Sequence, residues 1–206
     1  MMNAKEIMNS ADFKKCEAFH GHLCPGLSIG YRAAKTAMEW LQENRAEDEE
    51  VVAIVETDAC SADAVQVLTG CTFGKGNFIY KDYGKMGLTL FSRNTGRGVR
   101  VSMNPEAFSP DESHFALLRK VMAGEATETE RKEFDERHFQ RACEVLEMPA
   151  ETLFSMTPVE EEPPQKARIE PSKPCDRCGE PTMPSKMETV GDRKVCRGCQ
   201  EAVDIS

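Results

Sequence analysis

The stretch VVAIVETDACSADAVQVLTGC, residues 51–71, places an apolar run directly before a segment with helix signals. Its first part, residues 51–57, is continuous and rich in β-branched side chains, which is typical of a buried strand. Cys60 or Ser61 can cap the helix that follows, and Gly70 ends it. The stretch therefore predicts a strand that leads straight into a helix, with a cysteine at the junction.

Two more helices are expected before this strand. The first runs from Ser10, which caps it, to His20, and Gly21 is suited to end it. The second begins after Cys24 at its N-cap, because Pro25 suits the first helical position. Its apolar stripe consists of Leu27, Tyr31, Ala34, Met38 and Leu41. A strip of small residues beside the stripe would let another backbone approach closely: Gly26, Gly30, Ala33 and Ala37.

The rest of the first 150 residues shows both strand and helix patterns. FIYKDYG, GLTLFSR and GVRVSM, which begin at residues 78, 87 and 98, are predicted strands, and NTGRG forms a hairpin turn between the last two. SPDESHFALLRKVMAG and ETERKEFDERHFQRACEVLE are predicted amphipathic helices. The sequence thus predicts an α+β fold, with a mixed helix and antiparallel-sheet core domain over residues 1–150.

The composition changes after residue 150. Residues 151–172 are rich in Pro and Glu, as in VEEEPPQKARIEP, and predict a flexible, partly extended linker. Residues 173–206 carry two CxxC pairs, CDRC and CRGC. Each pair directs two thiolates at one tetrahedral ion from a tight turn, and four thiolates close the coordination shell. The expected module is a structural zinc ribbon with ligands Cys175, Cys178, Cys196 and Cys199.

Bound zinc would supply the folding free energy that so small a module lacks. Between the two pairs, METV and RKVC flank GD and predict a β-hairpin. The basic residues of the module are balanced by as many acidic ones, so the sequence does not favour nucleic-acid binding. Docking to a protein partner is the role that we expect for the ribbon.

Charge and cysteine content narrow the class of protein. The 206 residues carry a formal net charge of −9, which disfavours nonspecific attraction to nucleic acid or to an anionic membrane. No apolar run approaches the roughly 20 residues that span a bilayer, and the start resembles no secretory signal. We therefore expect a cytoplasmic protein, in which the nine cysteines serve as metal ligands or reactive thiols.

FHGHLCPG, residues 19–26, is the second candidate metal site. His20, His22 and Cys24 supply two or three ligands locally, and a position at a helix N-terminus favours the Cys24 thiolate. The structural alternative is a crowded turn with a buried cysteine and two surface histidines. A further ligand has to come from Cys60 or Cys71, which a helix over residues 61–69 would separate by roughly 15 Å. We favour Cys60 and keep Cys71 as a reserve ligand, acting across a dimer.

Several polar residues near Cys60 are candidates for supporting roles. Asp58 and Asp63 could hold a histidine ligand in place or act as a general base, or they could simply cap and solvate the helix. GCTFGK, residues 70–75, is too short for a phosphate-binding loop. Lys75 and Asn77 could still contact an anionic ligand, and the alternative for them is a polar turn.

HGHLCPGLSIGYRAA, DACSADAVQVLTGCTFGKGN and KDYGK occur in this order, and together they resemble the FmdE family, named after the E-type component of formylmethanofuran dehydrogenase. The resemblance covers roughly residues 10–150. It implies an α+β core, a homodimer and a metal-associated cleft. The positions that it carries over are His20, His22, Cys24, Cys60, Asp63, Gln66, Cys71, Lys75 and Asn77.

Two functions are compatible with these residues. A divalent ion, zinc or another transition metal, with three protein ligands and one open position could polarise a carbonyl or generate hydroxide for hydrolytic or one-carbon chemistry. Alternatively, the chain is an accessory protein that carries a metal or a metal cofactor to a partner. Redox sensing through Cys24 and Cys60 is a third, weaker hypothesis.

Overall fold

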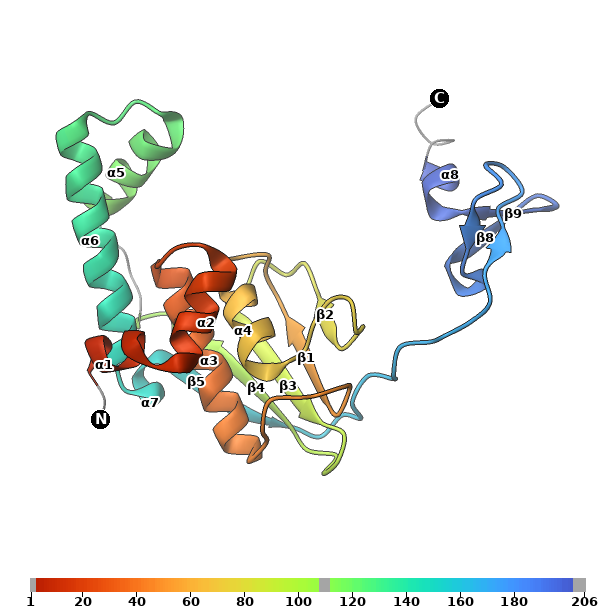
Figure 1. Cartoon of the computed structure of the whole chain (residues 1–206), viewed down its shortest axis with the longest axis horizontal. Coiled ribbons are helices and arrows are strands. Elements are labelled where there is room, and N and C mark those ends of the chain that lie inside the picture. Colours follow the sequence, from red (N-terminus) through yellow and green to blue (C-terminus); the bar gives the residue numbers. More distant parts are fainter. Residues whose placement is uncertain (1–2, 108–111, 202–206) are drawn as a thin grey trace. The chain divides into compact units, whose positions relative to one another are not determined.

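A computed structural model of the chain describes residues 3–107 and 112–201 (Figure 1). The chain divides between Lys166 and Ala167 into two compact units. The helices of the first unit are α1 (Ala4–Asn9), α2 (Ala11–His20), α3 (Pro25–Leu41), α4 (Ser61–Thr69), α5 (Glu112–Ala123), α6 (Glu128–Glu147) and α7 (Ala150–Leu153). Its strands are β1 (Val51–Val55), β2 (Phe78–Tyr80), β3 (Gly87–Ser92), β4 (Gly98–Met103) and β5 (Phe154–Val159).

The five strands form one sheet in the order β2-β1-β3-β4-β5. β1 runs parallel to β2, with Ile54 opposite Ile79, and antiparallel to β3, with Val55 opposite Leu88. The α+β class is confirmed, but the sheet is mixed and not wholly antiparallel as the strand pattern predicted. The physical reason is α4, which connects β1 to β2 and returns the chain so that β2 runs in the same direction.

The edge strand β5 lies inside the range 151–172, for which the composition predicted a flexible linker. Its residues pair with β4 along its whole length, from Phe154 opposite Met103 to Val159 opposite Gly98. The composition hid this strand because it is short and contains Pro158, which a sheet tolerates at its edge. The core therefore extends beyond residue 150, to the end of β5.

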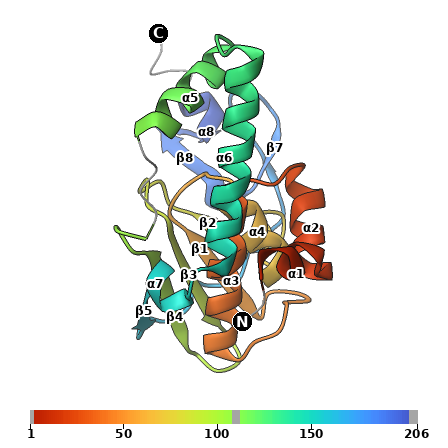
Figure 2. The same ribbon diagram turned by 90° about the vertical axis from the view of Figure 1, so that its left-hand side faces the viewer.

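Helices α3 and α4 pack against one face of the sheet (Figures 1 and 2). Val51, Ala53 and Val55 point from β1 into this core and are at most 5% exposed. The small-residue strip of α3 allows the predicted close approach: a Cβ atom at Gly30 would lie 2.2 Å from the Ser61 carbonyl oxygen of α4. Any larger residue at position 30 would therefore push the two helices apart.

The C-terminal unit is small and contains two hairpins. Its elements are β6 (Lys173–Pro174), β7 (Pro181–Thr182), the 3₁₀ helix η1 (Pro184–Lys186), β8 (Met187–Val190), β9 (Arg193–Cys196) and α8 (Arg197–Glu201). The hairpin predicted from METV and RKVC is confirmed, because β8 and β9 pair from Met187 opposite Cys196 to Val190 opposite Arg193. Among the described residues, no helix combines the length and the apolar character that crossing a bilayer requires.

A buried ion pair fixes the end of β1, from which the chain enters the α4 region. Glu56 is 7% exposed and accepts hydrogen bonds from Nε of Arg100 at 3.0 Å and from Nη2 at 2.7 Å. The Arg100 guanidinium holds the pKa of Glu56 below its ordinary value of 4.5. Because Arg100 lies on β4, this pair ties β1 to β4 across β3.

We expect Arg100→Leu to lower the free energy of unfolding by about 2–3 kcal/mol at pH 7, since it leaves the Glu56 carboxylate buried without its partner. A lowered folded-state pKa means that the pair stabilises the fold fully above the unfolded pKa. This stabilisation disappears as the pH falls through the folded value. Urea unfolding at neutral and acidic pH should therefore show a destabilisation that shrinks in acid. The exposed pair Lys132–Glu128 is the control, and Lys132→Leu should cost at most about 0.5 kcal/mol.

Candidate metal centre

His20 reaches the site from the last turn of α2. The helix ends there because Gly21 adopts a left-handed conformation with φ of 95°, as predicted. Nδ1 of His20 lies 2.7 Å from Oδ2 of Asp63 on α4. With its Nδ1 proton donated to this carboxylate, the ring leaves the Nε2 lone pair to bind an ion. Nε2 faces the Cys24 sulfur at 3.7 Å.

Cys24 occupies the predicted N-cap of α3. Its Sγ accepts a hydrogen bond from the backbone N–H of Leu27 at 3.3 Å, and Pro25 occupies the first turn. The side chain is 3% exposed. Burial raises the pKa of the Cys24 thiol to about 11, and the Leu27 hydrogen bond offsets this only in part. A cation is therefore the natural partner for a thiolate at this position.

Cys60 completes the group from the start of α4. Its side chain makes no capping hydrogen bond to the helix. The ligand atoms of His20, Cys24 and Cys60 all lie within 4.8 Å of one another. Two sulfurs and one imidazole nitrogen suit zinc and related transition metals. The sequence therefore pointed to the correct neighbourhood, and the fold brings together one histidine and two cysteines from three helices.

Gly26 provides a further test of whether these residues fit an ion. A Cβ atom at this position would lie 3.0 Å from Cβ of Cys60, 3.6 Å from its sulfur and 3.8 Å from the sulfur of Cys24. Glycine thus keeps open the space between the two thiols, which a side chain would fill. The sequence pattern placed Gly26 in the small-residue strip but gave no sign of a role at the site.

A cleft of about 410 Å³ opens beside the metal-site residues. Its lining includes His20, Cys60 and Asp63, together with Asp58 from the connection after β1 and Tyr80 from β2. This volume falls within the range of small-molecule sites. Asp63 thus has a defined partner in His20, whereas Asp58 faces the cleft as the candidate general base.

The other predicted site residues lie outside the group of three ligands. His22 is exposed, and its ring centroid is 4.4 Å from that of His20. Cys71 is fully buried and donates its S–H to the carbonyl of Val51 at 3.3 Å. Burial raises its pKa to about 11. The structure thus gives Cys71 a packing role within its own chain.

Gln66, Lys75 and Asn77 brace a turn. Oε1 of Gln66 accepts from the backbone of Phe73, and Nζ of Lys75 donates to the carbonyl of Asp48 at 3.1 Å. Asn77 is fully buried, and its amide nitrogen donates to the carbonyls of Asp48 and Val51. Their polar groups therefore hold the turn against the chain before β1.

In the C-terminal unit, the ligand atoms of the four predicted cysteines lie within 4.8 Å of one another: Cys175, Cys178, Cys196 and Cys199. Backbone N–H groups of residues 178, 196 and 177 donate to the sulfur of Cys175 and lower its pKa to about 6. This second cluster has the four-thiol set of a closed structural zinc site.

Comparison with known proteins agrees with both clusters. Residues 19–155 match the family described as "FmdE, Molybdenum formylmethanofuran dehydrogenase operon". The chain belongs to the FmdE family. Residues 168–204 match the prokaryotic dksA/traR C4-type zinc finger, so the FmdE core is followed by a zinc finger. The matched residues include His20, Cys24 and Cys60 in the first range and all four clustered cysteines in the second.

Two relatives illustrate the range of FmdE proteins. One, from Archaeoglobus fulgidus, is named a "probable S-adenosyl-L-methionine-binding protein" and is 36% identical over 181 residues, which are 84% of this chain and 49% of that protein. The chain thus spans about half the length of this relative. The other is a crystal structure of a tungsten formylmethanofuran dehydrogenase FmdE-like protein from Syntrophus aciditrophicus, with a TM-score of 0.63 and 27% identity. The match covers 97% of this chain and 92% of that one.

We expect Asp63→Ala to weaken metal binding at the core site about 10- to 100-fold, because His20 loses the carboxylate that orients its ring. The measurement is competition for zinc against a chelator of known affinity. Asp58→Ala is the matched control, since this carboxylate lines the same cleft but is not the one that holds His20. Equal zinc affinity in the two variants would contradict the assigned role of Asp63.

Proposed function

We propose that the chain binds a divalent transition metal in its core through Nε2 of His20, Sγ of Cys24 and Sγ of Cys60. The observation that supports this most strongly is the convergence of the three ligand atoms within 4.8 Å. A single ion contacts ligands at about 2.0–2.3 Å, so small side-chain movements suffice to close such a site. Zinc is our expectation for the core, and a structural zinc for the C-terminal cysteines.

The ligand set supports hydrolytic or one-carbon chemistry on a small substrate. A bound ion with three protein ligands has an open position at which a carbonyl is polarised or a water is activated. Asp63 keeps the His20 ring oriented, and burial of Cys24 excludes water from the rear of the site. Asp58 lines the cleft beside them and is placed to take a proton from a ligand bound there.

An accessory role is the second candidate, and the position of His22 favours it. This histidine is exposed, and its ring lies 4.4 Å from that of His20, so it can receive an ion before the buried ligands do. In this role the chain delivers a metal or a metal cofactor to a partner and docks through its zinc finger. The two roles differ in how readily the core ion exchanges.

Metal content per chain tests both clusters. We expect two ions in the wild-type protein and one in Cys24→Ser, which removes a core ligand. Cys178→Ser should also retain one ion, and in this case the core ion. Cys71→Ala is the matched control and should retain two, because that buried thiol contacts a backbone carbonyl. A wild-type protein with a single ion, retained in Cys24→Ser, would rule out the core site.

Exchange kinetics then separate the two roles. An ion that a mild chelator removes from the core within minutes favours delivery, and an ion that resists removal favours catalysis. We expect His22→Ala to slow loading and removal several-fold at unchanged affinity in the delivery role, whereas catalysis requires no such effect. Lys14→Ala is the control, since Lys14 is an exposed residue of the same helix–turn segment.

We also propose a cytoplasmic homodimer. None of the nine cysteines, all of them in the described residues, forms a disulfide, which agrees with a reducing compartment. The α5–α6 hairpin exposes large apolar side chains, among them Phe115 at 42% and Phe139 at 51%, which a second copy would cover. Sedimentation velocity measures the mass that decides the oligomeric state.

A further inference from the structure

Two of the most exposed aromatic rings of the chain line one groove. Phe73 is 80% exposed and Phe19 is 59% exposed. Both belong to the wall of a hollow of about 510 Å³, which we call the aromatic groove. It is lined by Lys15, Phe19, Arg45, Gln66, Val67, Thr72, Phe73 and Gly74. A phenyl ring in water contributes little to folding, so both rings are available to a ligand.

The turn that carries Phe73 is braced from several directions. The N–H of Phe73 donates to Oε1 of Gln66 at 3.3 Å, and the N–H of Thr72 donates to Oδ1 of Asn77 at 3.0 Å. Asn77 is fully buried, and its amide nitrogen donates to the carbonyl of Val51 at 2.9 Å. Phe73 is therefore displayed on a rigid support, which reduces the entropy cost of binding a ligand.

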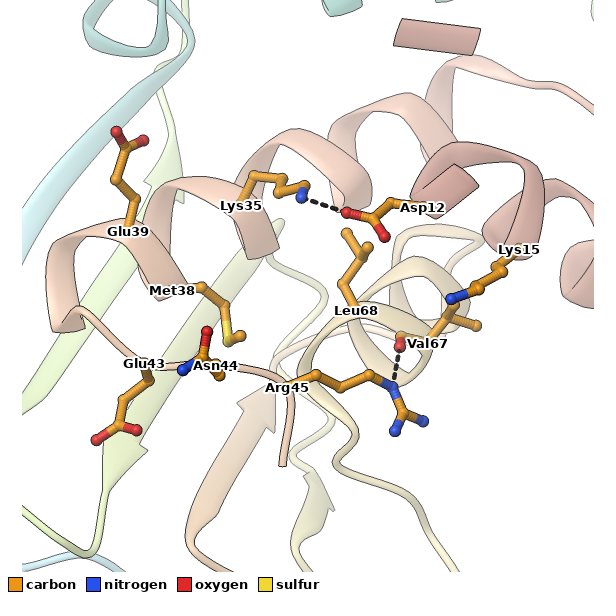
Figure 3. Close-up of a pocket in the computed structure, with 10 residues that line it drawn as sticks. All are labelled: Asp12, Lys15, Lys35, Met38, Glu39, Glu43, Asn44, Arg45, Val67 and Leu68. Atoms are coloured by element: carbon orange, nitrogen blue, oxygen red, sulfur yellow. Dashed lines mark hydrogen bonds and ion pairs between the residues drawn. The ribbon is translucent and has the colours of Figure 1, made fainter. Parts of the chain in front are cut away.

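The charge of the groove contrasts with that of the chain. Lys15 and Arg45 line it, and none of its described lining residues is acidic, although the net charge of the chain is −9. Nε of Arg45 donates to the carbonyl of Val67 at 2.9 Å, which fixes the guanidinium. Figure 3 shows Lys15 from α2 and Arg45 from the segment after α3 both reaching toward Val67 of α4.

A neighbouring hollow of about 480 Å³ shares Lys15, Arg45 and Val67 (Figure 3). It differs because Asp12 and Glu39 are among the acidic residues that line it. These carboxylates repel an anion, and Asp12 already neutralises Lys35. An anionic group held by Lys15 and Arg45 is therefore favoured on the side of the phenylalanines.

We propose that the aromatic groove binds a mononucleotide. The heteroaromatic ring stacks on Phe73 and Phe19, and the phosphate pairs with Lys15 and Arg45. A ring with one phosphate also matches a groove of this volume, which lies within the range of small-ligand sites. The proposal does not depend on the core metal, because no metal-site residue lines the groove.

The groove is nevertheless adjacent to the metal centre in sequence. Phe19 immediately precedes His20 on α2, and Gln66 lies one turn after Asp63 on α4. The two helices that hold the His20–Asp63 contact thus also carry walls of the groove. A mononucleotide bound there would sit beside the candidate metal centre.

The test uses flavin mononucleotide and adenosine monophosphate as probes, with riboflavin and adenosine as ring-only comparators. We expect each nucleotide to bind at least tenfold more tightly than its nucleoside, because only the nucleotide carries the phosphate that the two cations pair with. Phe73→Ala should weaken both nucleotides by about tenfold or more through the lost stacking. Lys15→Gln should weaken the nucleotides and leave the nucleosides unchanged.

Matched controls lie outside the groove. Phe139→Ala removes another exposed ring, and Lys14→Gln removes the neighbouring exposed charge of α2, and both should bind like wild type. The proposal is overturned if neither nucleotide binds at up to about 1 mM, or if nucleotide and nucleoside bind equally. It is also overturned if Phe73→Ala changes the sedimentation mass, since the groove would then face a second copy. Metal content unchanged in Phe73→Ala separates this test from that of the metal site.

Discussion

The close approach of α3 to α4 is the constraint on which the rest of the first unit depends. At Gly30 the two backbones are too near for any side chain, and at Gly26 a side chain would meet Cys60. This contact sets the two helix starts beside each other, so that Cys24 and Cys60 lie at one corner of the core. Without it the two thiols would remain on separate elements.

The histidine adds direction to this pair of sulfurs. Asp63 on α4 binds Nδ1 of His20 on α2, so a third helix is oriented against the other two. Glu56 and Arg100 hold the chain just before Cys60, because their ion pair spans the sheet from β1 to β4. The candidate site is thus supported by contacts that lie one step away from the ligands themselves, which is how metal sites are commonly kept in shape.

The C-terminal unit follows a different physical logic. Its four cysteines come from two short turns within about thirty residues, and its hairpins bury little apolar surface. Such a module relies on the ion for stability, since a core this small contributes too little free energy. The cluster is therefore predictable from spacing alone, whereas the core cluster depends on packing among distant helices.

Local sequence determined the helix boundaries, the caps at Cys24 and Gly21, the four-cysteine module and the α+β class, because each depends on residues that are close along the chain. Tertiary structure alone decided which ligands converge. It selected His20 over His22 and Cys60 over Cys71, recruited β5 from an apparent linker, and made β2 parallel to β1. These outcomes depend on how helices and strands pack, and packing is a property of contacts between segments that no local pattern records.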